Sequence, residues 1–194
     1  MKMKTIRMED VLEDVKQSYK CWSEFMEQEV DFWKVEKDWH TKPHCARVLL
    51  LTLIMGRLNH LCVDGLDALA MAAVFHDSRR QNDWLDVGHG QMAADYYRSY
   101  CEKTELPFDS RTYYIMAFHD RDDELGLRVL REKFPDDPDT VLLYQIFKDA
   151  DALDRFRLGA DALDVKYLRT GKSKDLVEFA KMLLESGPEK LLEG

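Results

Sequence analysis

Four polar side chains stand where apolar segments of the chain begin or end. His44 opens "HCARVLLL", His76 and Asp77 close "AAVFHD", and Asp151 lies within "KDADALD". A single histidine near a helix end is more often a cap or a hydrogen-bonding group than a metal ligand. Two histidines and two aspartates that several helices bring to one point, however, form a mixed imidazole and carboxylate set that suits Mn, Fe, Co, Ni or Zn.

The neighbouring pair His76-Asp77 sets a condition on the local structure. Adjacent residues on a straight α-helix point about 100° apart, so one ion can bind both only if the helix ends at the pair. We therefore expect a buried helix over 63–77 that closes at this doublet. A second buried helix is expected to begin near Pro43, because proline suits the first helical turn, and it places His44 in that turn.

This set of residues resembles the H...HD...D signature of the HD-domain superfamily of metal-dependent phosphohydrolases, over roughly residues 40–160. The flanks "HCARVLLL", "AAVFHDSRR" and "KDADALD" are similar to the family's contexts for the first His, the doublet and the last Asp. The family aligns the second Asp of "DAD", so the resemblance selects Asp151 rather than Asp149. It implies an all-α, HD-domain-like helical bundle with a buried metal site between helices.

The resemblance also implies which residues bind the metal and which one acts on water. The implied metal ligands are His44, His76, Asp77 and Asp151. A divalent transition metal would activate water for attack on phosphorus, and Asp77 would orient or deprotonate that water through its second oxygen.

Three cations are candidates for contact with the substrate. Arg79 and Arg80 follow the doublet directly, where a guanidinium could make paired hydrogen bonds to phosphate oxygens and offset charge in the reaction. The alternative for each arginine is an ion pair with Asp83 or Asp86 in a solvated loop. Lys148, three residues before the last Asp of the signature, is a further phosphate candidate.

Two more histidines bear on the number of metal ions. His119 follows an apolar helical segment, as His76 does, and is either a ligand of a second metal or a direct substrate contact. His89 lies only twelve positions after Asp77 (89 − 77 = 12), at the expected start of a helix, where backbone N–H groups favour anions. Phosphate binding and second-metal ligation both stay open for it. Family members with two metals resemble this arrangement, with the doublet Asp as the bridge. We expect surface or core positions for His40 and His60.

The resemblance therefore implies a phosphomonoesterase or phosphodiesterase that acts on a small anionic phosphorylated substrate. A nucleotide is what the family's distribution favours, although no Gly-rich phosphate loop or base-reading motif in this chain selects it. One alternative is a two-iron HD-type oxygenase of a small polyol or phosphonate. The other is a non-catalytic nucleotide-sensing HD domain, which the presence of all four signature residues disfavours.

The amino-acid composition limits the classes of molecule that we expect the protein to bind. A net charge of −9 over 194 residues argues against a nucleic-acid polymer as partner, because such binders carry an excess of Lys and Arg. The N-terminal segment has no apolar core, and no stretch approaches the roughly 20 apolar residues of a membrane span. The four cysteines form no C-x-x-C pair and are expected to be free thiols. We therefore expect a cytoplasmic protein without a membrane partner.

Apolar spacing predicts a single domain over 1–194 that consists of helices, and the low Gly and Pro counts agree with this. Besides the two buried helices, we expect an N-terminal helix over 8–38, helices after Gly88 and Gly90, over 110–121 and 122–134, a continuous helical segment over 140–170 with a hinge at Gly159, and a closing helix over 174–186. No alternating strand pattern is present. Trp22, Trp33 and Trp39 could form the surface of a homodimer.

Overall fold

The computed structural model describes residues 7–33, 41–84 and 86–193, and in these ranges it contains helices and no strand. The all-α prediction is confirmed. The α-helices are α1 (Met8–Glu29), α2 (Lys42–Leu58), α3 (Val63–Phe75), α4 (His89–Cys101), α5 (Ser110–His119), α6 (Asp123–Lys133), α7 (Asp139–Leu153), α8 (Gly171–Asp175), α9 (Val177–Ser186) and α10 (Pro188–Glu193). Two short 3₁₀ helices, η2 (Asp154–Leu158) and η3 (Val165–Tyr167), follow α7.

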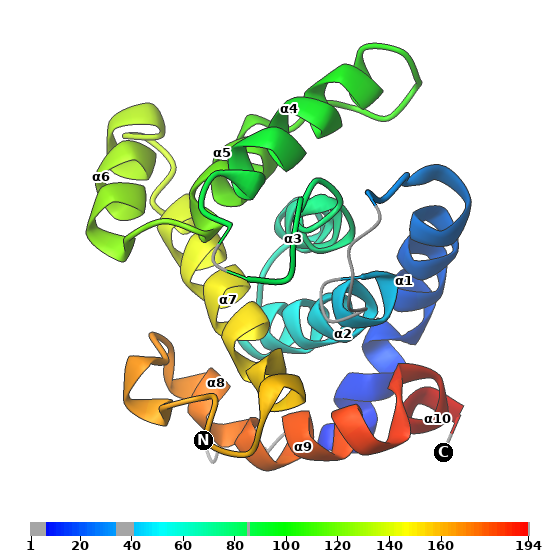
Figure 1. Cartoon of the computed structure of the whole chain (residues 1–194). Coiled ribbons are helices and arrows are strands. Elements are labelled where there is room, and N and C mark those ends of the chain that lie inside the picture. Colours follow the sequence, from blue (N-terminus) through cyan, green and yellow to red (C-terminus); the bar gives the residue numbers. More distant parts are fainter. Residues whose placement is uncertain (1–6, 34–40, 85, 194) are drawn as a thin grey trace.

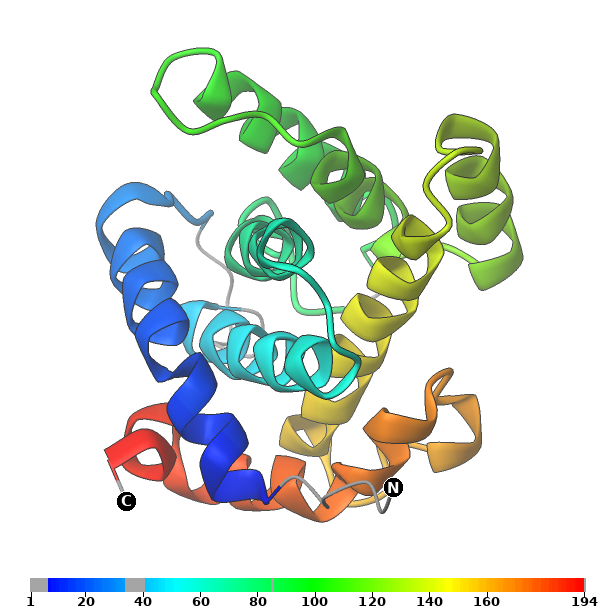
Figure 2. The same ribbon diagram turned by 180° about the vertical axis from the view of Figure 1, so that it is seen from behind.

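Helices α2 and α3 form the centre of the molecule. Both are apolar on nearly every face, as expected of helices that have no solvent side, and almost all of 48–55 and 68–75 is buried. Figures 1 and 2 show α3 in the middle of the fold, with α4 and α5 on one side and α2 on the other. Helix α7 runs beside this core and contacts α2, α3 and α5. The helices that carry the predicted ligands are therefore neighbours in space.

The chain turns at the His76-Asp77 doublet, as the sequence required. Helix α3 ends at Phe75, and His76 is its C-cap. The next backbone hydrogen bonds span only three residues, from Ser78 N to Phe75 O (3.0 Å) and from Arg80 N to Asp77 O (3.2 Å). Because the regular α-helix ends here, the side chains of His76 and Asp77 need not point about 100° apart, and both can face one point.

The N-terminal helix is shorter than the predicted 8–38. Helix α1 ends at Glu29, and Val30 is extended. Tertiary hydrogen bonds hold the residues that follow: Trp33 N donates to Ser78 O (3.0 Å), and Asp31 N donates to the Tyr96 hydroxyl (3.1 Å). These bonds replace the helical ones. The rest of the predicted helix, 34–38, lies outside the described residues.

The predicted continuous helical segment over 140–170 is wrong beyond residue 153. Helix α7 gives way to η2 at Asp154, and Gly159 ends η2 with a φ of +144°, which favours glycine. Asp149 then fixes the returning chain, because its carboxylate accepts hydrogen bonds from Thr170 N (2.8 Å) and Ser173 Oγ (2.8 Å). The predicted closing helix appears as α9, after a break at Leu176, and α8 and α10 were not predicted.

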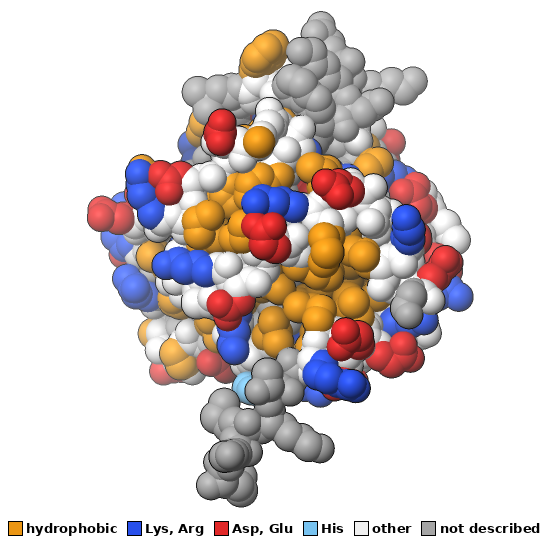
Figure 3. All heavy atoms as spheres, turned by 90° about the horizontal axis from the view of Figure 1, so that it is seen from below, with side chains coloured by type: hydrophobic (Ala, Val, Ile, Leu, Met, Phe, Trp, Pro, Cys, Tyr) orange, Lys and Arg blue, Asp and Glu red, His pale blue; other side chains and the backbone are white. Residues whose placement is uncertain are grey.

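Figure 3 shows the side of the molecule that carries α9 and α10, where an apolar area is surrounded by charged side chains. Met182 of α9 is half-exposed. None of the described helices is both long and apolar enough to cross a membrane. Of the tryptophans on which the homodimer prediction depends, Trp22 packs against Phe25, Trp33 is exposed, and Trp39 lies outside the described residues. The homodimer stays a prediction.

Candidate metal centre

Three of the four predicted signature residues, His44, His76 and Asp77, present ligand atoms within 4.8 Å of one another, and Asp151 of α7 reaches this set through His44. Nε2 of His44 lies 3.2 Å from Nε2 of His76, 3.4 Å from Oδ2 of Asp77 and 3.3 Å from Oδ1 of Asp151. The first three side chains are buried, whereas that of Asp151 is 33% exposed. This first group, His44, His76, Asp77 and Asp151, therefore has one carboxylate that solvent or a ligand can reach.

Hydrogen bonds at Nδ1 fix which ring nitrogen of each histidine faces the group. Nδ1 of His76 lies 2.8 Å from the carbonyl oxygen of Ala73, and Nδ1 of His44 lies 2.7 Å from Oδ2 of Asp154. A carbonyl oxygen and an ionised carboxylate can only accept, so each Nδ1 carries a proton, and Nε2 of the neutral ring presents a lone pair. Facing lone pairs and carboxylate oxygens repel one another unless a cation lies among them.

His89 and His119 form a second group on the other oxygen of the same aspartate. Oδ1 of Asp77 lies 3.0 Å from Nε2 of His89 and 3.7 Å from Nε2 of His119, and the two nitrogens are 3.0 Å apart. Here too Nδ1 donates to a backbone carbonyl, that of Asp86 (2.5 Å) and that of Met116 (2.7 Å). The two oxygens of Asp77 thus serve two histidine pairs.

The donor atoms fit metal ions at both places. His44, His76 and Asp77, and likewise Asp77, His89 and His119, each offer three ligand atoms close enough to hold one ion. Ligand atoms about 2.0–2.2 Å from a tetrahedral zinc ion are roughly 3.4 Å apart, which matches the observed spacings of the donor atoms. Imidazole with carboxylate suits several transition metals, so the donor set does not single out one element.

Two glycines explain how α4 brings His89 to the second group. Gly88 has a φ of +114° and caps the helix, a conformation that side chains strain to adopt. Gly90 lies so close to α5 that a Cβ atom there would be 2.5 Å from Met116 O and 2.8 Å from Nδ1 of His119. The carboxylate of Asp120 accepts hydrogen bonds from the backbone N–H groups of both glycines. The "GHG" sequence therefore serves close packing against His119.

Electrostatics shift the pKa values of the two histidines of the first group in opposite directions. Burial lowers the pKa of His76 to about 3, so its imidazole is neutral at neutral pH. Burial acts against ionisation of Asp151, yet the hydrogen bond from His44 brings the pKa of its carboxyl well below the ordinary value. Burial and Arg157 lower the pKa of His44, but its bonds to Asp151 and Asp154 outweigh them and raise it. A proton and a metal ion therefore compete for Nε2 of His44.

Sequence reasoning missed Asp154, which supports the first group from behind. Its carboxylate accepts a hydrogen bond from Nδ1 of His44 (2.7 Å) and two from Arg47, at 2.6 and 2.9 Å. Such carboxylates orient ligating histidines in metal sites. The available signal was the three-residue spacing of Asp151 and Asp154 in "DADALD". Asp149, the other aspartate of that segment, contacts Arg169 and the start of α8 instead.

The side chains of the two arginines after the doublet contact different parts of the structure. Arg79 stacks on Tyr96, with its guanidinium carbon 3.4 Å from the ring centroid, and donates to Asp31 O (2.5 Å). Arg80 lies against the second group, with Nη1 3.4 Å from Nε2 of His89, and donates to Trp84 O (2.7 Å). The structure thus places Arg80 at the site and Arg79 in a packing role away from it.

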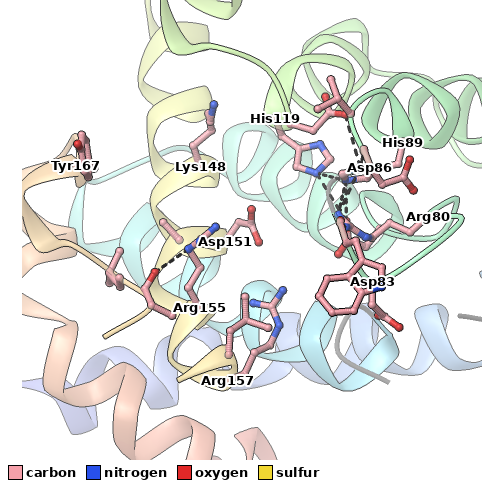
Figure 4. A pocket seen from close by; sticks show the side chains of 18 of the residues that line it. Arg80, Asp83, Asp86, His89, His119, Lys148, Asp151, Arg155, Arg157 and Tyr167 are labelled. Carbon is pink, nitrogen blue, oxygen red and sulfur yellow. Dashed lines mark hydrogen bonds and ion pairs between the residues drawn. The ribbon is translucent and has the colours of Figure 1, made fainter. Parts of the chain in front are cut away.

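A cavity of about 860 Å³ opens over both groups (Figure 4). Asp77, His89, His119 and Asp151 form part of its wall. Its basic lining residues are Arg80, Arg121, Lys148, Arg155, Arg157 and Arg169. Lys148 donates to Asp123 Oδ1 (2.6 Å) and Arg121 O (2.7 Å), and Arg79 is not among the described lining residues. The same lining contains seven aspartates: Asp77, Asp83, Asp86, Asp120, Asp151, Asp161 and Asp164. Individual basic side chains, and not a net positive charge of the cavity, would therefore hold an anionic ligand here.

The remaining histidines lie apart from the site. His60 is exposed in the turn after α2, as expected, and His40 is outside the described residues. No protein-family model matches the chain, and neither a known curated protein nor a solved structure matches it. Fold and site geometry together define an all-α protein with buried His/Asp groups between its helices that could hold metal ions.

Proposed function

We propose that this protein is a metal-dependent phosphohydrolase of the HD-domain superfamily that acts on a small phosphorylated substrate, with nucleotides as the first class to test. The observation that carries the proposal is the pair of His/Asp groups that share Asp77 beneath a cavity whose wall contains arginines as well as aspartates. The H...HD...D order of the ligands along the chain supports the choice of superfamily. Fold alone would not select a function.

In this proposal each group holds one divalent transition metal. His44, His76, Asp77 and Asp151 would bind the first ion, and Asp77, His89 and His119 the second. Such ions would supply Lewis-acid activation of water and of a phosphoryl oxygen.

The carboxylates then have different tasks from those expected from the sequence. Both oxygens of Asp77 face histidine pairs, so the second oxygen that was expected to serve water is already engaged. We assign Asp77 the task of holding the two groups together. Asp151 lines the cavity and is one-third exposed, so it is the carboxylate better placed to orient a water molecule through its second oxygen.

Arg80 is the first candidate for binding the phosphoryl group beside the second group of ligands. Its guanidinium is held by the carbonyl oxygens of Asn82 (3.2 Å) and Trp84 (2.7 Å), and Nη1 lies 4.0 Å from Oδ1 of Asp77. A fixed guanidinium needs no reorganisation to stabilise charge that builds on phosphoryl oxygens. The cavity volume of about 860 Å³ is within the usual range for sites that bind small molecules.

The two-group arrangement also favours one rival, a two-iron oxygenase of a small polyol or phosphonate. Both functions use paired metal sites, but the oxygenase requires iron in both and consumes O₂. Hydrolysis proceeds without O₂ and with redox-inert ions. A nucleotide sensor without activity would bind its ligand and release no product.

The test is hydrolysis of a panel of substrates by protein reconstituted with Mn²⁺, Co²⁺, Zn²⁺ or Fe²⁺, measured as release of phosphate, pyrophosphate or p-nitrophenol. The panel contains p-nitrophenyl phosphate, bis(p-nitrophenyl) phosphate and nucleoside mono-, di- and triphosphates. We expect wild type to hydrolyse at least one of them and His44→Ala, with its helical content retained, to hydrolyse none. Metal-loaded wild type that hydrolyses none of them would refute the proposal, and O₂ uptake with iron would favour the oxygenase.

A further inference from the structure

The sequence Phe-His-Asp occurs twice in the chain, each time at the end of a helix. Phe75-His76-Asp77 closes α3, and Phe118-His119-Asp120 closes α5. The two histidines are held alike, because Nδ1 of each lies near the carbonyl oxygen three residues earlier, at 2.8 Å for His76 and 2.7 Å for His119. The two aspartates differ, however. Asp77 faces the histidine rings of both candidate ligand groups, whereas Asp120 contacts the backbone of another helix.

Asp120 binds the start of α4 from the end of α5. Its Oδ2 accepts hydrogen bonds from the backbone N–H groups of Gly88 and of Gly90, the latter at 3.4 Å. The N–H groups at the start of a helix lack intrahelical partners, and a negative charge is stabilised there. Gly88 is the N-cap of α4 and has no side chain that could accept these bonds. The carboxylate of Asp120 therefore takes the part of the missing cap.

His89 lies between these two glycines in the chain, so Asp120 holds the backbone on both sides of it. Oδ2 of Asp120 also lies 3.6 Å from Nδ1 of His89, the ring nitrogen that donates to Asp86 O (2.5 Å). The other ring nitrogen, Nε2, lies 3.0 Å from Oδ1 of Asp77 and 3.0 Å from Nε2 of His119. Asp120 is therefore behind His89, and the ligand atoms of the second group are in front of it.

Burial makes the bonds of Asp120 effective. Its side chain is only 5% exposed, and its Oδ1 accepts no hydrogen bond from the described residues, although Nε of Arg121 is 3.4 Å away. The two bonds to the start of α4 are thus its principal ones. A buried charged group is costly without hydrogen bonds, and in such surroundings the bonds that it does make are stronger than in water.

We propose that Asp120 is a positioning residue for the second metal ion. Through the start of α4 it places His89 so that Nε2 meets the ligand atoms of Asp77 and His119. His119 and Asp120 are neighbours, so the end of α5 supplies one ligand and also the group that places another. Figures 1 and 2 show the two helices side by side, as this arrangement requires. This inference rests on the proposed function, because the second ion belongs to it.

The test uses Co²⁺ as the probe, added to metal-free protein. Competition with a chelator gives the affinity of each ion, and the visible absorption of bound Co²⁺ reports its coordination. Asp120→Asn should bind the first ion like wild type and the second about 10- to 100-fold more weakly, with a changed absorption spectrum of the second ion. The control is Asp95→Asn, which removes another carboxylate that joins α4 to α5, through the Tyr113 hydroxyl (2.7 Å). It should bind both ions like wild type.

Binding of the second ion by Asp120→Asn that equals wild type overturns this inference and leaves the proposed function standing. Equal weakening of both ions, or the same loss in Asp95→Asn, would show a general effect on the fold and also overturns it. Wild type that binds one ion and still hydrolyses a phosphate ester overturns the inference alone, whereas wild type that binds no ion overturns both.

If Asp120→Asn does not fold, Asp120→Ser decides. Serine can cap a helix through its hydroxyl oxygen, but it carries no charge and offers one oxygen in place of two. Weaker binding of the second Co²⁺ ion by folded Asp120→Ser, with the first ion unaffected, supports the inference. Unchanged binding of the second ion overturns it.

Discussion

Asp154 and His44 are joined by a hydrogen bond of 2.7 Å between Oδ2 and Nδ1, behind the first group of candidate ligands. This bond holds the imidazole in the tautomer that presents Nε2 to a metal. We predict that Asp154→Asn lowers metal affinity about 10- to 100-fold, as loss of such an orienting partner does in other metal sites. Competition with a chromophoric chelator measures the affinity. Asp95→Asn, an exposed position on α4, is the control and should leave it unchanged.

Replacement of the two aspartates of "DAD" should affect different properties, namely stability for Asp149 and metal content for Asp151. Asp149 is fully buried and pairs with Arg169, so Asp149→Ala should lower the free energy of unfolding by about 3–5 kcal/mol, the usual cost of breaking a buried pair. Its folded fraction should keep metal. Asp151→Ala should instead lose metal with little change in urea-induced unfolding of the metal-free protein. The reverse pattern would show that the two roles are assigned to the wrong aspartates.

A substitution at Gly90 tests the second group of candidate ligands without removing any of its side chains. Ala at this position would drive a Cβ atom against Met116 O and the ring of His119, and we expect a loss of stability of about 1–3 kcal/mol together with weaker binding of the second metal ion. Gly171→Ala is the matched control, because a Cβ atom there meets nothing within 4 Å. Thermal unfolding and metal titration follow both effects. Equal behaviour of the two variants would argue against close packing at Gly90.

Alanine variants of the neighbouring residues Arg79 and Arg80 should differ: one should lose stability and the other should lose activity. Arg79→Ala should cost about 0.5–2 kcal/mol of stability through the loss of its cation–π contact with Tyr96, and its kinetics should not change. Arg80→Ala should keep its metal content and lose activity toward phosphate esters. Steady-state kinetics and chemical denaturation of the two variants provide the comparison. Unchanged kinetics in Arg80→Ala would remove that side chain from the substrate site.

The sequence was sufficient for the central helices and for the closeness of His44, His76 and Asp77, the candidate ligands of the first group. The apolar character of α2 and α3 and the proline at the start of α2 set their positions, and the requirement that His76 and Asp77 share a target predicted where α3 ends. The end of α1 was not predictable, because the bond between Asp31 and Tyr96 spans 65 residues. Such a tertiary contact leaves no trace in local apolar spacing.

The role of Asp154 was not predicted from the sequence, for a related reason. The apolar spacing of α7 continues through "DRFRLG", so the sequence predicts an uninterrupted α-helix there. The structure changes to 3₁₀ geometry at Asp154 instead. Adjacent arginines present a second difficulty. Arg79 and Arg80 have the same chemistry, and only the turn after α3 decides that one faces Tyr96 and the other His89.

Elemental analysis of protein purified without chelator tests the candidate metal centre most directly. Because Asp77 serves both groups, we predict about two transition-metal ions per wild-type chain, about one in His119→Ala and none in Asp77→Ala. Circular dichroism should show that all three proteins keep their helices. A wild-type metal content no higher than that of folded Asp77→Ala would contradict a metal centre at this site.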